Sequence, residues 1–346
     1  MARNSLFELK VEDLFTSNKQ MNGCLQLAAL AAESDVPILL LGETGTGKTL
    51  LAQAIHNSSA RARGQFISFN ASAMSDTLLE SQLFGHERGA FTGAQRMVKG
   101  KFELADTGTL FFDEIADMSP LAQAKVLRAV EYGEFERLGS ERMMHSNARI
   151  ISATNASLRE HVRDGRFRED LYHRLAGLTL YLPPLRERPE DLPGLIATEL
   201  HESARAMGKS LSAIHPQAMH QMLHYDWPGN LRELHHVIRT IVLFCKGPEV
   251  TPEHVVLQPE LYRNLKEPAP AHPAAWLPEK TNGHSRLGED LTLTAALHKH
   301  IRHVLNQAHG NQRETARLLG ISRSRLARHL KVILQNEADG GLETRP

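Results

Sequence analysis

The sequence predicts an α/β domain, then an all-α region, and finally a basic helical module. Three observations support this order. Short apolar β-type runs alternate with helical stretches up to about residue 163, the pattern of a parallel sheet covered by helices. Only helical spacing is found over 189–257. The proline-rich segment 259–290 cannot form a helix interior or a central strand, so we expect a partly extended linker.

The predicted elements of the first domain come in strand–helix pairs. In chain order these pairs are 38–41 with 50–56, 66–70 with 78–83, 109–112 with 121–130, and 150–153 with 158–162. Since each strand is followed by a helical stretch, we expect the strands to be parallel and connected through helices that cover the sheet.

The charge of the chain is unevenly distributed. The 346 residues carry 40 Lys and Arg against 40 Asp and Glu, so the formal net charge is zero. Segment 291–336 alone holds eight basic residues and one acid, which leaves 32 basic and 39 acidic residues elsewhere. This split indicates a module for a polyanion joined to a different kind of domain.

Several classes of protein are excluded by the same reading. No apolar run is long enough for a membrane span, and Met1–Lys10 lacks a signal pattern, so we expect a cytoplasmic protein. Two cysteines, Cys24 and Cys245, are too few for a disulfide framework.

A phosphate-binding loop is the strongest motif for chemistry. It consists of Gly42, Glu43, Thr44, Gly45, Thr46, Gly47, Lys48 and Thr49, directly after an apolar strand and before a helix. Its glycines let backbone N–H groups curl around phosphate oxygens. Lys48 would bind the β- and γ-phosphates and Thr49 would bind magnesium. The motif predicts ATP with Mg²⁺.

Polar residues end two further strands. Asp113 and Glu114 follow the strand 109–112, where buried acids are costly unless they have a function. Asp113 would orient magnesium and Glu114 would activate the attacking water as general base. Asn155 ends the strand at 150–153 and could sense the γ-phosphate. Hydrolysis also needs cations, but spacing alone does not distinguish Arg168, Arg174 or Arg232 from surface arginines.

With these motifs in place, the segment Gly89-Ala90-Phe91-Thr92-Gly93-Ala94 resembles the signature of the bacterial enhancer-binding proteins, the AAA+ activators of sigma-54 RNA polymerase. The resemblance covers about 15–258 and resumes at 291–335. It implies an α/β AAA+ ATPase with an α-helical lid, in which the hexapeptide forms a loop tip that contacts sigma-54. Its glycines suit a mobile, tightly turned loop, and Phe91 would be an exposed apolar probe.

The resemblance also implies roles for residues that spacing left undecided. Asn70 would hold Glu114 until the γ-phosphate is sensed. Arg168 and Arg174 match the paired arginine fingers that reach the ATP of a neighbouring subunit, and Arg232 matches the second sensor. Since such sites form between subunits, the resemblance implies a ring, expected to be a hexamer.

The chain departs from the family pattern at two points. Most members have an acid where Thr49 stands, which leaves the ATPase expectation intact but affects magnesium handling. About 15–25 residues precede the AAA+ core, too few for a receiver domain. The chain therefore resembles the receiver-less subgroup, of which the phage-shock activator is an example. We expect control by an inhibitory or activating protein partner or by expression level.

The C-terminal module has the pattern of a helix–turn–helix, with helices at 312–319 and 323–333 around a turn at 320–322. It resembles the Fis-type domain, which binds paired enhancer half-sites, and the apolar stripe of 293–308 would form a dimer face. Leu318, Leu326 and Leu330 can face a small core. The candidate DNA contacts are Arg313, Arg323, Ser324, Arg325, Arg328 and His329.

We therefore expect an ATP-driven activator that binds enhancer DNA and remodels the closed complex of sigma-54 RNA polymerase. Two alternatives stay open: an AAA+ remodeller of another target, such as a helicase loader, and a DNA-binding repressor that uses ATP only to switch assembly. The expected segments are an N-terminal arm at 1–14, the AAA+ α/β subdomain with the sigma-54 loop at 15–184, the lid at 185–258, the linker at 259–290, the helix–turn–helix at 291–335 and a tail at 336–346.

Overall fold

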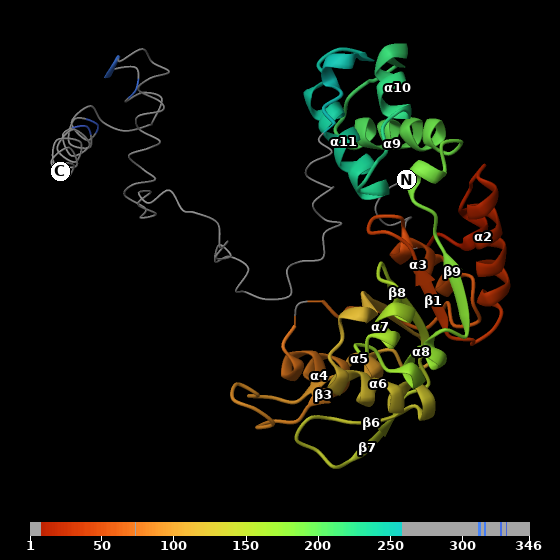
Figure 1. Ribbon diagram of the computed structural model, residues 1–346, viewed down its shortest axis with the longest axis vertical. Helices are drawn as coiled ribbons and strands as arrows, with labels where there is room; N and C mark the ends of the chain where they lie inside the picture. The colour runs from red at the N-terminus through yellow and green to blue at the C-terminus, as the bar shows by residue number, and fades with distance from the viewer. Residues whose placement is uncertain are drawn as a thin grey trace, which may run out of the picture. The chain divides into compact units, whose positions relative to one another are not determined.

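The computed structural model describes residues 8–72 and 74–257, together with Asn311, Gln312, Thr315, Leu326 and Leu330. The chain divides into two compact units, Met1–Ala269 and Pro270–Pro346. The first unit contains a parallel sheet with helices on both faces and, after it, a group of helices (Figure 1).

Five parallel strands form the sheet. Their order is β2 (Phe66–Asn70), β5 (Thr109–Asp113), β8 (Arg149–Thr154), β1 (Ile38–Leu41) and β9 (Leu178–Tyr181). The four predicted strands are confirmed. The fifth, β9, was missed: it pairs with β1 in the register Ile38 to Leu178 and forms one edge of the sheet.

Alternation along the strands builds two cores, one on each face of the sheet. Leu39 belongs to one core, whereas its neighbours Ile38 and Leu40 belong to the other. Helices α2 (Lys19–Ala32) and α3 (Lys48–Asn57) supply the core of one face. The opposite face is covered by α4 (Asp76–Phe84), α5 (Lys101–Leu104), α6 (Pro120–Tyr132), α7 (Leu158–Arg163) and α8 (Glu169–Leu175).

Two small hairpins interrupt this scheme, and the sequence did not predict them. One is formed by β3 (Gly85–His86) with β4 (Val98–Lys99), the other by β6 (Glu134–Glu136) with β7 (Met143–His145). The hairpins touch, because Glu87 N–H donates to Leu138 O (3.0 Å) and Leu138 N–H donates to Gly85 O (3.0 Å).

The helical group consists of α9 (Leu192–Ala206), α10 (Pro216–Leu223) and α11 (Asn230–Phe244), which Figure 1 shows as a cluster of its own. Trp227 is fully buried at its centre and donates from Nε1 to Met222 O over 2.9 Å. The prediction of helices alone was wrong here, because β10 (Ala213–Ile214) pairs in parallel with β11 (Glu249–Val250). Short 3-10 turns are η1 (Val11–Asp13), η2 (Ile115–Asp117), η3 (Leu185–Glu187) and η4 (Pro252–His254).

The second unit is described at five residues. Thr315 is buried and donates through Oγ1 to Asn311 O over 2.9 Å. Leu326, predicted to face a small core, is buried, and Leu330 is half-buried. The predicted DNA contacts Arg313, Arg323, Ser324, Arg325, Arg328 and His329 lie outside the described residues, as does the predicted linker. Within the described ranges, none of the helices combines the length and apolar character that a bilayer crossing requires.

Candidate functional site

The phosphate loop connects β1 to α3 in the conformation that its glycines permit. Gly45 has φ of +83° and Gly47 has φ of +103°, values that residues with a side chain rarely adopt. A Cβ on Gly45 would also lie 2.3 Å from Gly229 O. Since α3 begins at Lys48, the free N–H groups of its first turn lie at the end of the loop, where an anion is favoured.

Lys48 places a positive charge beneath this loop. Its Nζ donates to Gly42 O (2.8 Å) and Glu43 O (3.1 Å), and the side chain is buried. Burial lowers the pKa of Lys48, while the nearby Glu114 and Asp113 raise it. These hydrogen bonds leave the ammonium on neutral carbonyls, so an incoming phosphate can replace them. Thr49 follows as an exposed residue of α3.

The acids and Asn155 meet this loop at the carboxyl ends of the strands. Glu114 Oε2 accepts a hydrogen bond from Asn155 N–H (3.3 Å), and Asn155 Nδ2 donates to Thr44 Oγ1 (3.0 Å). Burial raises the pKa of Glu114, and Lys48 opposes that shift. Glu114 also has φ of +52°, a strained value for a residue with a long side chain. Strain of this kind is common at functional sites.

Asn70 lies beside the acids but contacts a different group. The register of β2 with β5 places Asn70 opposite Asp113, next to Glu114. Its Oδ1 accepts from Ser72 N–H (2.8 Å), and the Ser72 hydroxyl in turn donates to Asp117 (2.7 Å). The predicted role of Asn70 in holding Glu114 stays a prediction.

Of the three arginines, Arg232 is the one that the structure brings to the phosphate loop. The Cβ of Arg232 is 3.2 Å from the position that a Cβ on Gly45 would take. The positive charge of Arg232 lowers the pKa of Lys48. Arg168 is exposed and forms an ion pair with Asp170 (2.7 Å). The exposed Arg174 donates to the backbone carbonyls of Val130 (3.5 Å) and Glu131 (3.2 Å) in α6.

The start of the helical group adds residues that sequence reasoning missed. Arg186 binds Glu43 with both terminal nitrogens (2.8 and 2.7 Å), a two-point ion pair between the helical group and the phosphate loop. The fully buried Asn230 donates to Thr44 O (3.1 Å) and Glu43 Oε2 (3.3 Å). Leu231 N–H donates to Gly45 O (3.0 Å). Nothing in the sequence near Arg186 or Asn230 marks either residue as a partner of the loop.

The hexapeptide Gly89–Ala94 forms a turn between β3 and β4. Gly89 N–H donates to Ala94 O (2.8 Å), which closes the turn, and Gly89 and Gly93 both have positive φ. Thr92 and Gly93 are exposed, whereas Ala94 is buried. The expectation for Phe91 was wrong in part: the ring is half-buried against His86 rather than fully exposed.

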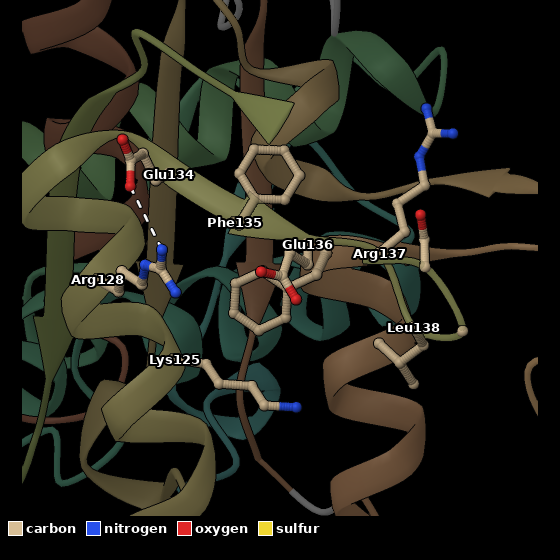
Figure 2. A pocket seen from close by; sticks show the side chains of 10 residues that line it. Lys125, Arg128, Glu134, Phe135, Glu136, Arg137 and Leu138 are labelled. Atoms are coloured by element: carbon tan, nitrogen blue, oxygen red, sulfur yellow. Dashed lines mark hydrogen bonds and ion pairs between the residues drawn. The ribbon is translucent and has the colours of Figure 1, made fainter. Parts of the chain in front are cut away.

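A pocket of about 390 Å³ lies where α6 meets the β6–β7 hairpin. Figure 2 shows its charged walls, with Arg128 paired to Glu134 (3.5 Å). Lys125 is paired to Glu80 (2.6 Å), and Arg137 binds Glu103 (2.6 Å). Because its cations already bind carboxylates, this pocket does not match the phosphate chemistry of the loop. No group of three His, Cys, Asp or Glu suited to a metal ion is found among the described residues.

Comparison with known proteins identifies the family to which the chain belongs. Residues 14–181 match the sigma-54 interaction domain, 186–272 match the AAA+ ATPase lid domain, and 298–331 match the Fis family of bacterial regulatory proteins. The transcriptional regulator NtrC of Salmonella typhimurium is 38% identical over 328 residues, which cover 92% of this chain and 70% of NtrC. The chain belongs to the family of sigma-54-dependent activators.

Other members of the sigma-54 activator family are similar over smaller shares of their length. ZraR of Klebsiella oxytoca is 41% identical over 308 residues, 88% of this chain and 66% of ZraR. HyfR of Escherichia coli is 43% identical over 267 residues, 77% of this chain and 40% of HyfR. The chain thus spans less than two thirds of the length of these two relatives.

A solved structure gives the same fold. NtrX from Brucella abortus, solved in complex with ATP, superimposes with a TM-score of 0.66 at 30% identity over 92% of this chain and 69% of that one. The predicted fold class is confirmed: an α/β AAA+ domain with a parallel sheet, a helical lid and a C-terminal helix–turn–helix domain of the Fis family.

Proposed function

We propose that this sigma-54 activator hydrolyses ATP and uses the energy to remodel the closed complex of sigma-54 RNA polymerase into an open one. One observation carries the proposal: Asn155 donates hydrogen bonds both to Glu114 and to Thr44 of the phosphate loop, with Lys48 beneath the loop. A base, a sensor and a phosphate cradle held together in this way suit hydrolysis of a nucleoside triphosphate.

ATP with Mg²⁺ fits the residues of the site. The ammonium of Lys48 rests on carbonyl oxygens and is free to turn toward the β- and γ-phosphates. Thr49 and Asp113 would hold Mg²⁺, which takes one or two protein ligands and phosphate oxygens. The bound metal would neutralise charge on the phosphates. Glu114, whose raised pKa places it closer to neutral pH, would take a proton from the attacking water.

The two exposed arginines of the α8 region support a ring. Arg168 and Arg174 are exposed, and within the described residues the hydrogen bonds of their side chains go to Asp170, Val130 and Glu131 rather than to the phosphate loop of the same chain, so they suit the ATP of a neighbouring subunit. An arginine supplied in trans stabilises the charge that develops on the transferred phosphoryl group. We therefore propose that the chain assembles into a hexamer whose ATP sites lie between subunits, with Arg232 as the sensor in the lid.

The remaining parts would direct this ATPase to its target. The exposed apex of Gly89–Ala94 would contact sigma-54, and the Fis-type domain at 298–331 would bind enhancer DNA as a dimer. An activator of this kind would work in the cytoplasm. Membership of the subgroup without a receiver domain, and control by a protein partner, stay predictions.

The deciding experiment is open-complex formation on a sigma-54 promoter with purified polymerase and the full chain. We expect promoter melting with ATP and none with a non-hydrolysable analogue. Absence of melting in both, in a preparation that hydrolyses ATP and binds DNA, would contradict the proposal and favour another remodelling target.

A further inference from the structure

Four hydrogen bonds run in series from Glu114 to the lid. Glu114 accepts from Asn155 N–H, and Asn155 Nδ2 donates to the Thr44 hydroxyl. The carbonyl of Thr44 accepts from Asn230 Nδ2 (3.1 Å), and Asn230 Oδ1 accepts from Leu185 N–H (2.7 Å). Leu185 is the first residue of η3, at the entry to the lid. The carboxylate proposed as the base is therefore connected to the lid through Thr44 and Asn230.

Both the oxygen and the nitrogen of the Asn230 side-chain amide form hydrogen bonds. The residue is fully buried, its oxygen accepts from Leu185 N–H, and its nitrogen donates to Thr44 O and Glu43 Oε2. A buried amide without partners is costly, so these bonds hold the lid turn against the phosphate loop. The backbone of Asn230 has φ of +54°, a conformation that Asn and Asp tolerate better than most residues.

Thr44 is the point at which the two halves of the series join. Its hydroxyl binds Asn155, on the strand that ends beside Glu114, and its carbonyl binds Asn230 in the lid. Because Thr44 belongs to the phosphate loop itself, bound phosphates, the sensor Asn155 and the lid all act on one short segment.

We propose that Thr44 and Asn230 are positioning residues of the ATPase site. Thr44 orients Asn155 against Glu114, and Asn230 fixes the phosphate loop to the lid. The inference rests on the proposed ATP hydrolysis and adds two residues to it. It predicts different consequences for the two side chains: loss of the Thr44 hydroxyl slows the chemical step, whereas loss of the Asn230 amide weakens the hold on nucleotide.

Two near-isosteric variants separate these effects. Thr44→Val keeps the branched shape and the main-chain carbonyl but leaves the Asn155 amide without its hydroxyl partner. Asn230→Asp keeps the size and the tolerance of positive φ, but its carboxylate faces the Thr44 carbonyl and the Glu43 carboxylate. The new carboxylate oxygen would face the Thr44 carbonyl, which is also an acceptor, and the Glu43 carboxylate, which has the same charge. Both contacts are repulsive, so the lid turn is pushed away from the loop.

The test is steady-state ATPase of the full chain, with the Kd of ATP from calorimetric titration. We expect Thr44→Val to lower kcat about tenfold with KM within about threefold. Asn230→Asp should raise KM and Kd about tenfold with kcat within about threefold. A tenfold effect is about the size expected for the net loss of one hydrogen bond.

A matched control addresses general destabilisation of the lid. Lys209 Nζ donates to the carbonyls of Val242 (2.7 Å), Leu243 (2.7 Å) and Cys245 (2.9 Å), which end α11 far from the residues that contact the loop. Lys209→Met should lower the melting temperature and leave KM, kcat and Kd unchanged. A KM shift like that of Asn230→Asp in this control would overturn the proposal, because it would trace the effect to lid stability alone.

The remaining outcomes separate this proposal from the proposed function. If both variants keep the KM and kcat of the wild-type ATPase, the positioning roles are overturned and the ATPase proposal stands. A wild-type chain that binds ATP but does not hydrolyse it would contradict the proposed function. In that case the role of Asn230 is still tested by the Kd of ATP, and an unchanged Kd in Asn230→Asp would overturn it. If Asn230→Asp does not fold, Asn230→Gly removes the amide while accepting the backbone, and the same Kd increase is expected.

Discussion

Phe91 lies edge-on against His86, with ring centroids 5.0 Å apart. His86 in turn hydrogen-bonds the Ser81 hydroxyl of α4 through Nδ1 (2.8 Å). The aromatic residue of the hexapeptide is therefore anchored to the body of the domain, and the exposed apex is formed by Thr92 and Gly93. Contact with sigma-54 is expected to begin at this apex.

Thr92→Ala should separate the two activities that we propose for the chain. Because Thr92 is exposed and distant in sequence from the phosphate loop, the variant is expected to keep most of its ATPase rate while losing open-complex formation. ATPase assays and promoter-melting assays on the same preparation measure both. A parallel loss of both activities would argue against this division.

Lys48→Ala should abolish nucleotide binding. The buried ammonium lies under the loop on two carbonyl oxygens, and alanine brings no charge to replace it. Titration of ATP into the variant measures the loss, with the exposed Lys19→Ala as the control. Unchanged affinity in Lys48→Ala would show that the site is assigned wrongly.

The ATPase rate should depend on pH through Glu114. Burial raises the pKa of this carboxyl from its ordinary value of 4.5, so it takes up a proton at a higher pH than an exposed glutamate. A general base must be deprotonated, and kcat is therefore expected to fall as the pH drops through the raised pKa and to recover above it. Glu114→Gln should bind ATP, hydrolyse it at least about a hundredfold more slowly and lose this acid limb. An acid limb that survives in Glu114→Gln would assign the titration to another group.

Arg174 and Glu114 should complement each other between subunits. If Arg174 acts on a neighbour's ATP, a mixed ring places an intact Arg174 beside an intact Glu114 at some interfaces. We expect inactive Arg174→Ala and inactive Glu114→Gln chains to regain ATPase when mixed. Activity that stays at the level of the separate variants would favour a finger acting within its own subunit.

Trp227 should be the strongest single contributor to lid stability. The side chain is fully buried and its indole N–H is hydrogen-bonded, so Trp227→Ala removes a large apolar volume and leaves Met222 O without its donor. The expected loss is about 3–5 kcal/mol in the free energy of unfolding. Urea denaturation followed by circular dichroism measures it. Tyr132→Ala, at a side chain that is 65% exposed, should change the same quantity by less than about 0.5 kcal/mol.

The sequence predicted the parts of the molecule that are encoded locally. A strand, a glycine-rich loop and a helix start occupy Ile38–Asn57 without a gap, so the phosphate loop was identified with its surroundings. The acids at the end of β5 and Asn155 after β8 followed from the same rule, because parallel strands end at one edge of the sheet.

Contacts between distant segments were not predictable in this way. The partner of Thr44 in the lid, Asn230, is 186 residues away, and Arg186 is 143 residues from Glu43. The edge strand β9 was missed because it is a short stretch, Leu178–Tyr181, closely followed by Pro183 and Pro184. Phe91 was expected to be exposed because nothing near it in the hexapeptide indicates that His86 lies against it.

The close approach of Gly45 to Gly229 affects how variants of the loop should be interpreted. A methyl group at position 45 would meet a main-chain oxygen of the lid at 2.3 Å before any phosphate is present. A Gly45→Ala chain would therefore suffer displacement of the lid in addition to any damage to the cradle. Loss of ATP binding in such a chain would say little about phosphate contacts, and a thermal melt in the absence of nucleotide would reveal the collision by itself.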